Sequence, residues 1–90
     1  MADDEWTNPP KAFRYIHFEL INPGLNQRRF YLISWQETLL GPGVVRVWGR
    51  KGETQTLTVD PFPSLGEAWP TIRATIRSRL RHGYKVVGRG

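Results

Sequence analysis

The chain has 90 residues, which is enough for one small domain with a thin core and leaves no room for a second, catalytic domain. It contains no cysteine, so disulfide bonds, thiolate zinc sites and a cysteine nucleophile are all excluded. The formal net charge is +5, and ten of the 13 basic residues are arginine, a side chain suited to forked hydrogen bonds with phosphate. Nucleic acid is therefore the leading partner class, with anionic membranes and acidic proteins as the alternatives.

The two ends of the chain differ from its middle in composition. Residues 1–11 hold three of the eight acids and the Pro9-Pro10 pair, and we expect them to form a flexible N-terminal arm in which Trp6 is exposed. Residues 12–87 are expected to form the domain, and residues 88–90 to fray. The acidic start is unlike a signal peptide and no apolar stretch could span a bilayer, so we expect a soluble, cytoplasmic protein with no membrane partner, nucleoid-associated if bacterial.

Runs of β-branched and aromatic residues, bounded by glycine and proline, predict the strands of one sheet. The first run places Ile16, Phe18 and Leu20 on one face. The second run is apolar on both faces, which is typical of a central strand, with Tyr31, Ile33 and Trp35 sharing one side. The four runs cover residues 13–20, 30–35, 44–50 and 54–60, and residues 84–87 are a candidate closing strand.

One helix is predicted after the fourth strand. Ser64 and Glu67 match a capping box, and the helix is expected to run from Leu65 to His82 and end at Gly83. Pro70 removes a backbone donor, so we expect a distorted first turn. The sequence thus predicts an α+β domain, a twisted, mainly antiparallel sheet of four to five strands with the helix packed on one face. The helix would contact the sheet through an apolar stripe of Leu65, Ala68, Trp69, Ile72, Ile76 and Leu80.

The third strand carries the residues best suited to binding. Because strand side chains alternate, we expect Val45 and Val47 on the core side and Arg46, Trp48 and Arg50 on the opposite side. A wide aromatic face between two planar cations suits a sugar or base edge with its phosphates. The alternative is a core role for Trp48, since tryptophan is highly buried on average.

The tripeptide Trp48-Gly49-Arg50, followed by Gly52, lies between an aromatic strand and a polar strand that leads into a Ser-x-x-Glu-Ala helix. In this order of elements the chain resembles the WGR domain family, found in DNA-dependent poly(ADP-ribose) polymerases and in small bacterial proteins. The resemblance implies that Trp48 packs on the sugar of a terminal nucleotide. It also implies that Arg50 lies beside it, near the DNA backbone or a neighbouring domain.

Further contact residues are expected around this motif. The resemblance implies a DNA-contacting asparagine before the central strand, a place that falls to Asn26 or Arg28, and a tyrosine near the DNA after the helix, which is Tyr84. Because phosphates attract guanidinium and ammonium groups, we expect Arg46 and Arg50 to clamp adjacent phosphates. General attraction is expected from Arg28, Arg29 and Lys51.

The glycines of the motif are expected to serve backbone geometry. Gly49 would let the strand twist or bulge, and Gly52 would shape a turn whose backbone N–H groups face a phosphate. A solvated turn is the alternative for the Arg50-Lys51-Gly52 run. Glu53 follows directly and would repel phosphate.

The remaining polar residues indicate no catalysis. His17 and His82 have no acid or histidine at ligand-like spacing, and no phosphate-binding glycine loop or carboxylate pair is visible. We therefore expect a protein that is not an enzyme and has no metal, cofactor or small-molecule substrate. The helix arginines are mainly explained by solubility and the helix dipole, with a ladder of Arg73, Arg77 and Arg81 beside the apolar stripe and Arg79 snorkelling at its end.

Charge and motif together support one leading hypothesis, a nucleic-acid-binding module acting through a Trp/Arg surface. DNA is expected rather than RNA, at duplex ends or nicks, which would make the protein a reader of DNA strand breaks. The competing hypothesis is a protein-interaction adaptor that uses the same Trp-Gly-Arg surface.

Overall fold

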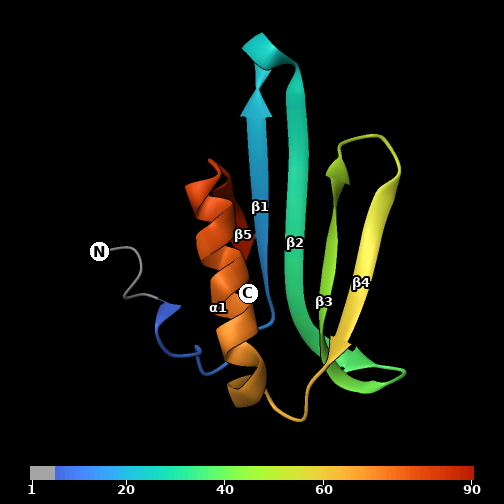
Figure 1. Ribbon diagram of the computed structural model, residues 1–90, viewed down its shortest axis with the longest axis vertical. Coiled ribbons are helices and arrows are strands. Elements are labelled where there is room, and N and C mark those ends of the chain that lie inside the picture. Colours follow the sequence, from blue (N-terminus) through green and yellow to red (C-terminus); the bar gives the residue numbers. More distant parts are fainter. Residues whose placement is uncertain (1–5) are drawn as a thin grey trace.

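A five-stranded antiparallel sheet with one helix on one face makes up the computed structural model, which describes residues 6–90 (Figure 1). The strand order is β4-β3-β2-β1-β5, so every consecutive pair from β1 to β4 forms a hairpin and β5 returns to the free edge of β1. The predicted α+β class is confirmed. The elements are β1 (Tyr15–Asn22), a 3₁₀ turn η2 (Pro23–Leu25), β2 (Gln27–Thr38), β3 (Gly41–Arg50), β4 (Gln55–Pro61), α1 (Leu65–Arg81) and β5 (Lys85–Arg89).

The strands are longer than the apolar runs that predict them. In β2 the pairing continues outward to the polar Gln27, Arg28 and Arg29, which the sequence places before the strand. These residues pair because a two-stranded β1–β2 ribbon extends past the end of β3, up to the η2 turn (Figure 1). Arg28 and Arg29 are therefore held on a strand rather than on a loop.

Helix α1 begins and ends close to where its caps predict. The Ser64 hydroxyl accepts a hydrogen bond from the Glu67 amide at 3.2 Å, and Gly83 follows the helix with φ +92°, the left-handed conformation that terminates helices. The helix continues through Pro70. Its buried residues, Ala68, Trp69, Ile72 and Ile76, are all members of the predicted stripe.

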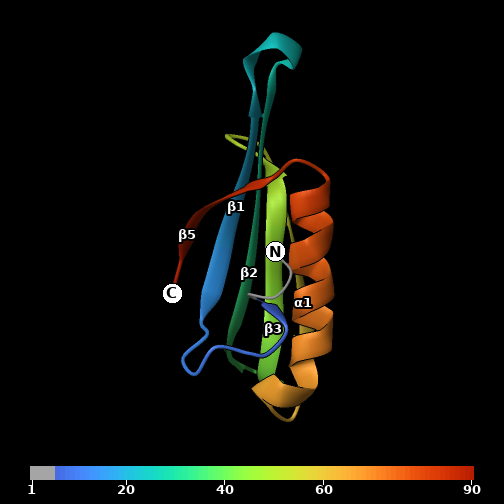
Figure 2. The ribbon, with the colours of Figure 1, turned by 90° about the vertical axis from the view of Figure 1, so that its left-hand side faces the viewer.

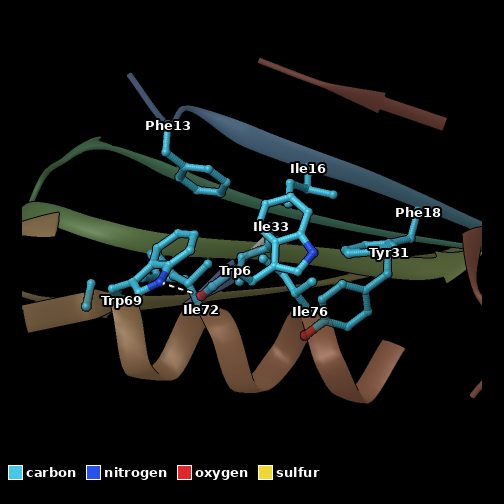
Figure 3. Close-up of a cluster of buried hydrophobic side chains, with 11 residues drawn as sticks. Trp6, Phe13, Ile16, Phe18, Tyr31, Ile33, Trp69, Ile72 and Ile76 are labelled. Carbon is cyan, nitrogen blue, oxygen red and sulfur yellow. Dashed lines mark hydrogen bonds between the residues drawn. The ribbon is translucent and has the colours of Figure 1, made fainter. Parts of the chain in front are cut away.

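The core lies between α1 and one face of the sheet, and Figure 3 shows its side chains pointing from the strands toward the helix. Figure 2 shows the opposite face of the sheet without a covering helix. Val44 is fully buried in this core, while Val45 and Val47 lie on the uncovered face. The expectation that Val45 and Val47 form the core side of the third strand is therefore wrong. The reason is register: cross-strand partners share a face, and Trp48 lies opposite the core residue Tyr31.

Trp6 is a core residue, which corrects the expectation that it is exposed. Its side chain is only 4% exposed, and its carbonyl oxygen accepts a hydrogen bond of 2.9 Å from the indole N–H of Trp69 (Figure 3). Phe13 packs edge-on against the same Trp69 ring at 5.3 Å. The segment before β1 thus contributes two aromatic side chains, Trp6 and Phe13, to the core cluster. Residues 1–5 of the expected flexible arm lie outside the described residues.

The C-terminal residues are hydrogen-bonded, although the sequence predicts that they fray. Gly88 and Arg89 belong to β5, and the Gly90 carbonyl accepts hydrogen bonds from the amides of Arg14 and Tyr15. The strand supplies backbone partners that compensate for the weak propensity of a Gly-Arg-Gly tail.

Candidate nucleic-acid interface

The Trp48 ring stacks on the ring of Tyr31, a residue of the neighbouring strand β2. The two residues are direct cross-strand partners, and their rings stack with centroids 5.5 Å apart and planes 15° from parallel. Tyr31 is buried, whereas Trp48 is only partly buried and packs at the border of the core. Trp48 thus combines the two predicted roles, contact surface and core residue, because one side of it packs against the core and the rest is accessible.

Two arginines continue the same face immediately beyond this stack. Arg29 lies opposite Arg50, two pairs further along than Tyr31 and Trp48 and therefore on the same face. Both are exposed at the end of β3, where the β1–β2 ribbon extends past it. Like charges placed directly opposite destabilise a sheet, and Glu53 is the only acid paired with either arginine among residues 6–90, so the pair keeps a net positive charge that favours an anionic ligand.

The Arg50 side chain is fixed by two contacts. Its Nη2 donates a hydrogen bond of 2.8 Å to the carbonyl oxygen of Asn26, which adopts a left-handed conformation (φ 52°) after η2. Its Nε lies 3.1 Å from a carboxylate oxygen of Glu53, three residues along the chain. The backbone of Asn26 thus helps to aim Arg50, and Glu53 already occupies one edge of the guanidinium.

Two glycines of the motif meet specific backbone requirements. A Cβ on Gly49 would lie 3.0 Å from the Thr54 carbonyl oxygen and 3.4 Å from the Cα of Gln55, so a side chain there would force the start of β4 to shift by a few tenths of an ångström. Gly52 has φ +81° in the β3–β4 turn, a conformation that glycine adopts at little cost. Both residues shape the end of β3 that presents Trp48 and Arg50.

The other cations of the predicted set are compensated or face elsewhere. Arg46 shares the face of Trp48 but is only 16% exposed, and its Nη1 lies 2.6 Å from a carboxylate oxygen of Asp60. Lys51 forms an ion pair with Glu19 on the uncovered face of the sheet. Arg28 also points to that side, since it alternates with Arg29 along β2. The structure therefore brings Trp48, Arg50 and Arg29 together and separates Lys51 and Arg28 from them.

Two other kinds of feature, a cluster of metal ligands and a membrane-spanning helix, are absent from the described residues. No group of three or more potential metal ligands occurs among residues 6–90. Within the same range, neither helix combines the length and apolar character that crossing a bilayer requires. The cluster around Trp48 is an arrangement of aromatic rings and guanidinium groups, which can stack on a ring or bind an anion.

A model of the family described as the WGR domain matches residues 15–90. The chain belongs to the WGR domain family. WGR domains are nucleic-acid-binding modules of poly(ADP-ribose) polymerases and related proteins, and they are binding rather than catalytic domains. No curated protein and no solved structure matches the chain significantly.

In this WGR domain, two residues that the sequence does not mark as part of the site lie next to the motif. Tyr31 supports Trp48, and the guanidinium carbon of Arg79 lies 4.9 Å from the Tyr31 ring centroid and 5.4 Å from that of Tyr84. The apolar run of β2 shows Tyr31 only as a core residue, because its pairing with Trp48 depends on strand register. Tyr84, which the resemblance places near the DNA, joins the cluster through Arg79.

Burial governs the charge state of the tyrosine beneath the site. Desolvation raises the pKa of Tyr31 above its usual value, and the positive charges of Arg46 and Arg79 offset this only in part. Tyr31 is consequently a neutral ring at physiological pH, which suits a cation lying over its face.

Proposed function

We propose that this WGR domain binds DNA at duplex ends or nicks, with Trp48 stacking on a terminal sugar or base. The observation that carries the proposal is the block formed by Trp48, Tyr31, Arg29 and Arg50, which places an accessible ring directly beside two guanidinium groups on one face. A nucleotide offers the matching pair of groups, a flat apolar ring system and an anionic phosphate.

Phosphate binding follows from the charges at the end of β3. Arg29 has no carboxylate partner among residues 6–90, and Arg50 keeps donors that Asn26 and Glu53 do not use. A phosphate between Arg29 and Arg50 would accept hydrogen bonds from both and relieve their mutual repulsion. Charge-assisted hydrogen bonds of this kind are stronger than neutral ones, so this is the strongest anion position in the proposed site.

The preference for an end follows from the ring. The interior of a duplex presents phosphates at its surface but keeps its bases stacked, whereas an end or nick exposes a nucleotide that can receive Trp48. In the proposal, Asn26 and Tyr84 border the contact surface, and Arg46 is held by Asp60 as a support for the strand. Lys51 and Arg28 contribute general attraction from the other side of the sheet.

Fluorescence anisotropy with two forms of one DNA sequence tests the proposal. A 5′-phosphorylated blunt duplex and a closed dumbbell are titrated at two salt concentrations with wild type, Trp48→Ala and the control Trp35→Ala. Trp35 is a partly buried tryptophan on the same sheet face, opposite Val44 and away from the arginine pair. Base stacking on an aromatic side chain is worth about 1–3 kcal/mol, so Trp48→Ala should weaken binding to the open duplex roughly tenfold or more, with Trp35→Ala close to wild type.

Two outcomes would reject the proposal. Equal binding to both DNA forms, lost with salt and unaffected by Trp48→Ala, would leave only a generic basic surface. Absence of binding at low salt would instead favour the protein adaptor, and a nuclease-resistant partner lost in Trp48→Ala would then identify that role.

A further inference from the structure

Arg79 is a partly buried cation on α1 that no acid among residues 6–90 compensates. Its guanidinium lies over the rings of Tyr31 and Tyr84, and its Nη2 donates a hydrogen bond of 3.3 Å to the Ser78 hydroxyl. Its Nε is buried without a hydrogen-bond partner, and none of residues 6–90 offers it a carboxylate. The Nη donors that Ser78 does not use therefore remain for a ligand, on a guanidinium that lies close to two aromatic rings.

Arg79 shares with Arg29 the lack of an acidic partner among residues 6–90, whereas three other cations near the motif are paired. Arg46, Arg50 and Lys51 each pair with an acid, namely Asp60, Glu53 and Glu19. From residue 68 to the C-terminus the chain contains six basic residues and no acid, so no acid from this segment can compensate Arg79. The helix dipole favours a cation near a helix C-terminus but supplies no acceptor for a buried Nε. An anionic ligand would instead accept hydrogen bonds from the Nη groups of the guanidinium, because Nε is itself closed to solvent.

The position of Arg79 connects it to the site on β3. Tyr31 stacks on Trp48, and Arg79 lies over the same Tyr31 ring, so one aromatic ring joins the tryptophan to the helix cation. Figure 3 shows Tyr31 extending from β2 toward α1. Trp48 and Arg79 thus belong to one continuous array that ends at Tyr84 in the connection between α1 and β5.

We infer that Arg79, held between Tyr31 and Tyr84, forms a second anion subsite that binds a backbone phosphodiester of the same nucleic-acid strand whose terminal nucleotide lies on Trp48. The inference rests on the proposed function and extends it from β3 to the end of α1. The strand would pass from the Arg29–Arg50 pair across Trp48 to the helix, so the helix takes a direct part in binding. The arginine ladder predicted on α1 consists of Arg73, Arg77 and Arg81, so Arg79 is not one of its members.

Salt dependence distinguishes a phosphate contact from a purely structural role. Each phosphate contact contributes about 0.9 to the slope of log K against log salt for duplex DNA. Wild type, Arg79→Gln, Arg79→Lys and the control Arg81→Gln are titrated with the 5′-phosphorylated blunt duplex over a range of salt concentrations. Arg81→Gln removes the same charge from an exposed position in the last turn of the same helix. Circular dichroism verifies that each variant is folded.

Arg79→Gln should lower the slope by about 0.9 and weaken binding at low salt several-fold, while Arg81→Gln changes the slope by much less. Arg79→Lys keeps the charge and should restore most of the slope. A weaker Arg79→Gln complex with an unchanged slope would show that Arg79 only positions Tyr31, and this would overturn the subsite. An Arg79→Gln variant that binds like wild type would overturn it as well.

The same titrations separate this inference from the proposed function. A slope that depends on Arg79, combined with binding indifferent to Trp48→Ala, would support the helix subsite and reject end recognition through Trp48. If binding required Trp48 but Arg79→Gln left both affinity and slope unchanged, end recognition through Trp48 would be supported and the helix subsite rejected. Absence of wild-type binding to any duplex would overturn both.

Discussion

Trp6→Ala tests whether the segment before β1 is an integral part of the folded domain. Trp6 is 4% exposed, its ring lies 6.5 Å from that of Trp69, and the guanidinium of Arg89 lies 5.3 Å from its centroid. The Trp6 carbonyl also accepts the hydrogen bond of the buried Trp69 indole. Removing the side chain therefore weakens both the core and the contact that satisfies a second tryptophan.

The size of the effect follows from the area that Trp6 buries. An aromatic side chain buries about 150–250 Å², which at roughly 25 cal/mol per Å² corresponds to about 4–6 kcal/mol. Residues 7–12 are exposed, so in the variant the segment can detach and recover chain entropy, which limits the loss. We expect the free energy of unfolding to fall by about 3 kcal/mol, the lower end of the range for aromatic-to-alanine changes in cores.

Urea unfolding followed by far-UV circular dichroism measures this loss without relying on the tryptophan that the variant removes. Lys11→Ala, an exposed position in the same segment, serves as the control and should change the free energy of unfolding by no more than about 0.5 kcal/mol. If Trp6→Ala cost less than about 1 kcal/mol, Trp6 would not be a core residue and the reasoning would be refuted.

Three further substitutions test local features of the fold. Gly66→Ala in α1 places a methyl group in ordinary contact with the Ser64 hydroxyl at 3.8 Å and should stabilise the domain by roughly 0.5–1 kcal/mol. Gly52→Ala places a side chain at φ +81° and should destabilise the domain by about 1 kcal/mol. If the urea midpoints of both variants moved in the same direction, the two backbone assignments would be contradicted. Because the pKa of Tyr31 is raised in the folded state, the stability linked to its proton is fully present below its unfolded value and is lost as the pH rises through the folded value. Tyr31→Phe should therefore reduce the loss of stability above about pH 10, and an identical pH profile for the two proteins would argue against a buried phenol.

Much of the fold follows from short-range patterns. The Ser64 cap, the helical stripe from Ala68 to Ile76 and the terminating Gly83 depend on residues within one or two turns of one another, and all three appear in the structure as the sequence predicts. The alternation of Phe18 with its neighbours in β1 is equally local, as is the prediction that Trp48 and Arg50 share a face of β3. Such features need no knowledge of the rest of the chain, because period and cap chemistry are properties of the segment itself.

Long-range pairing settles what these patterns leave open. The residues of β3 alone do not decide which face of the strand packs against α1, because both faces carry apolar side chains. The pairing of Trp48 with Tyr31 decides it, and the face that carries Val44 packs against α1. Trp6 belongs to the core because it packs against Trp69 of α1, and Arg79 contacts the Tyr31 ring because the side chain of Tyr31 points to the face of the sheet that α1 covers. These contacts join residues that are distant in the chain, so their geometry exists only once sheet and helix have packed, and no local period or motif encodes it.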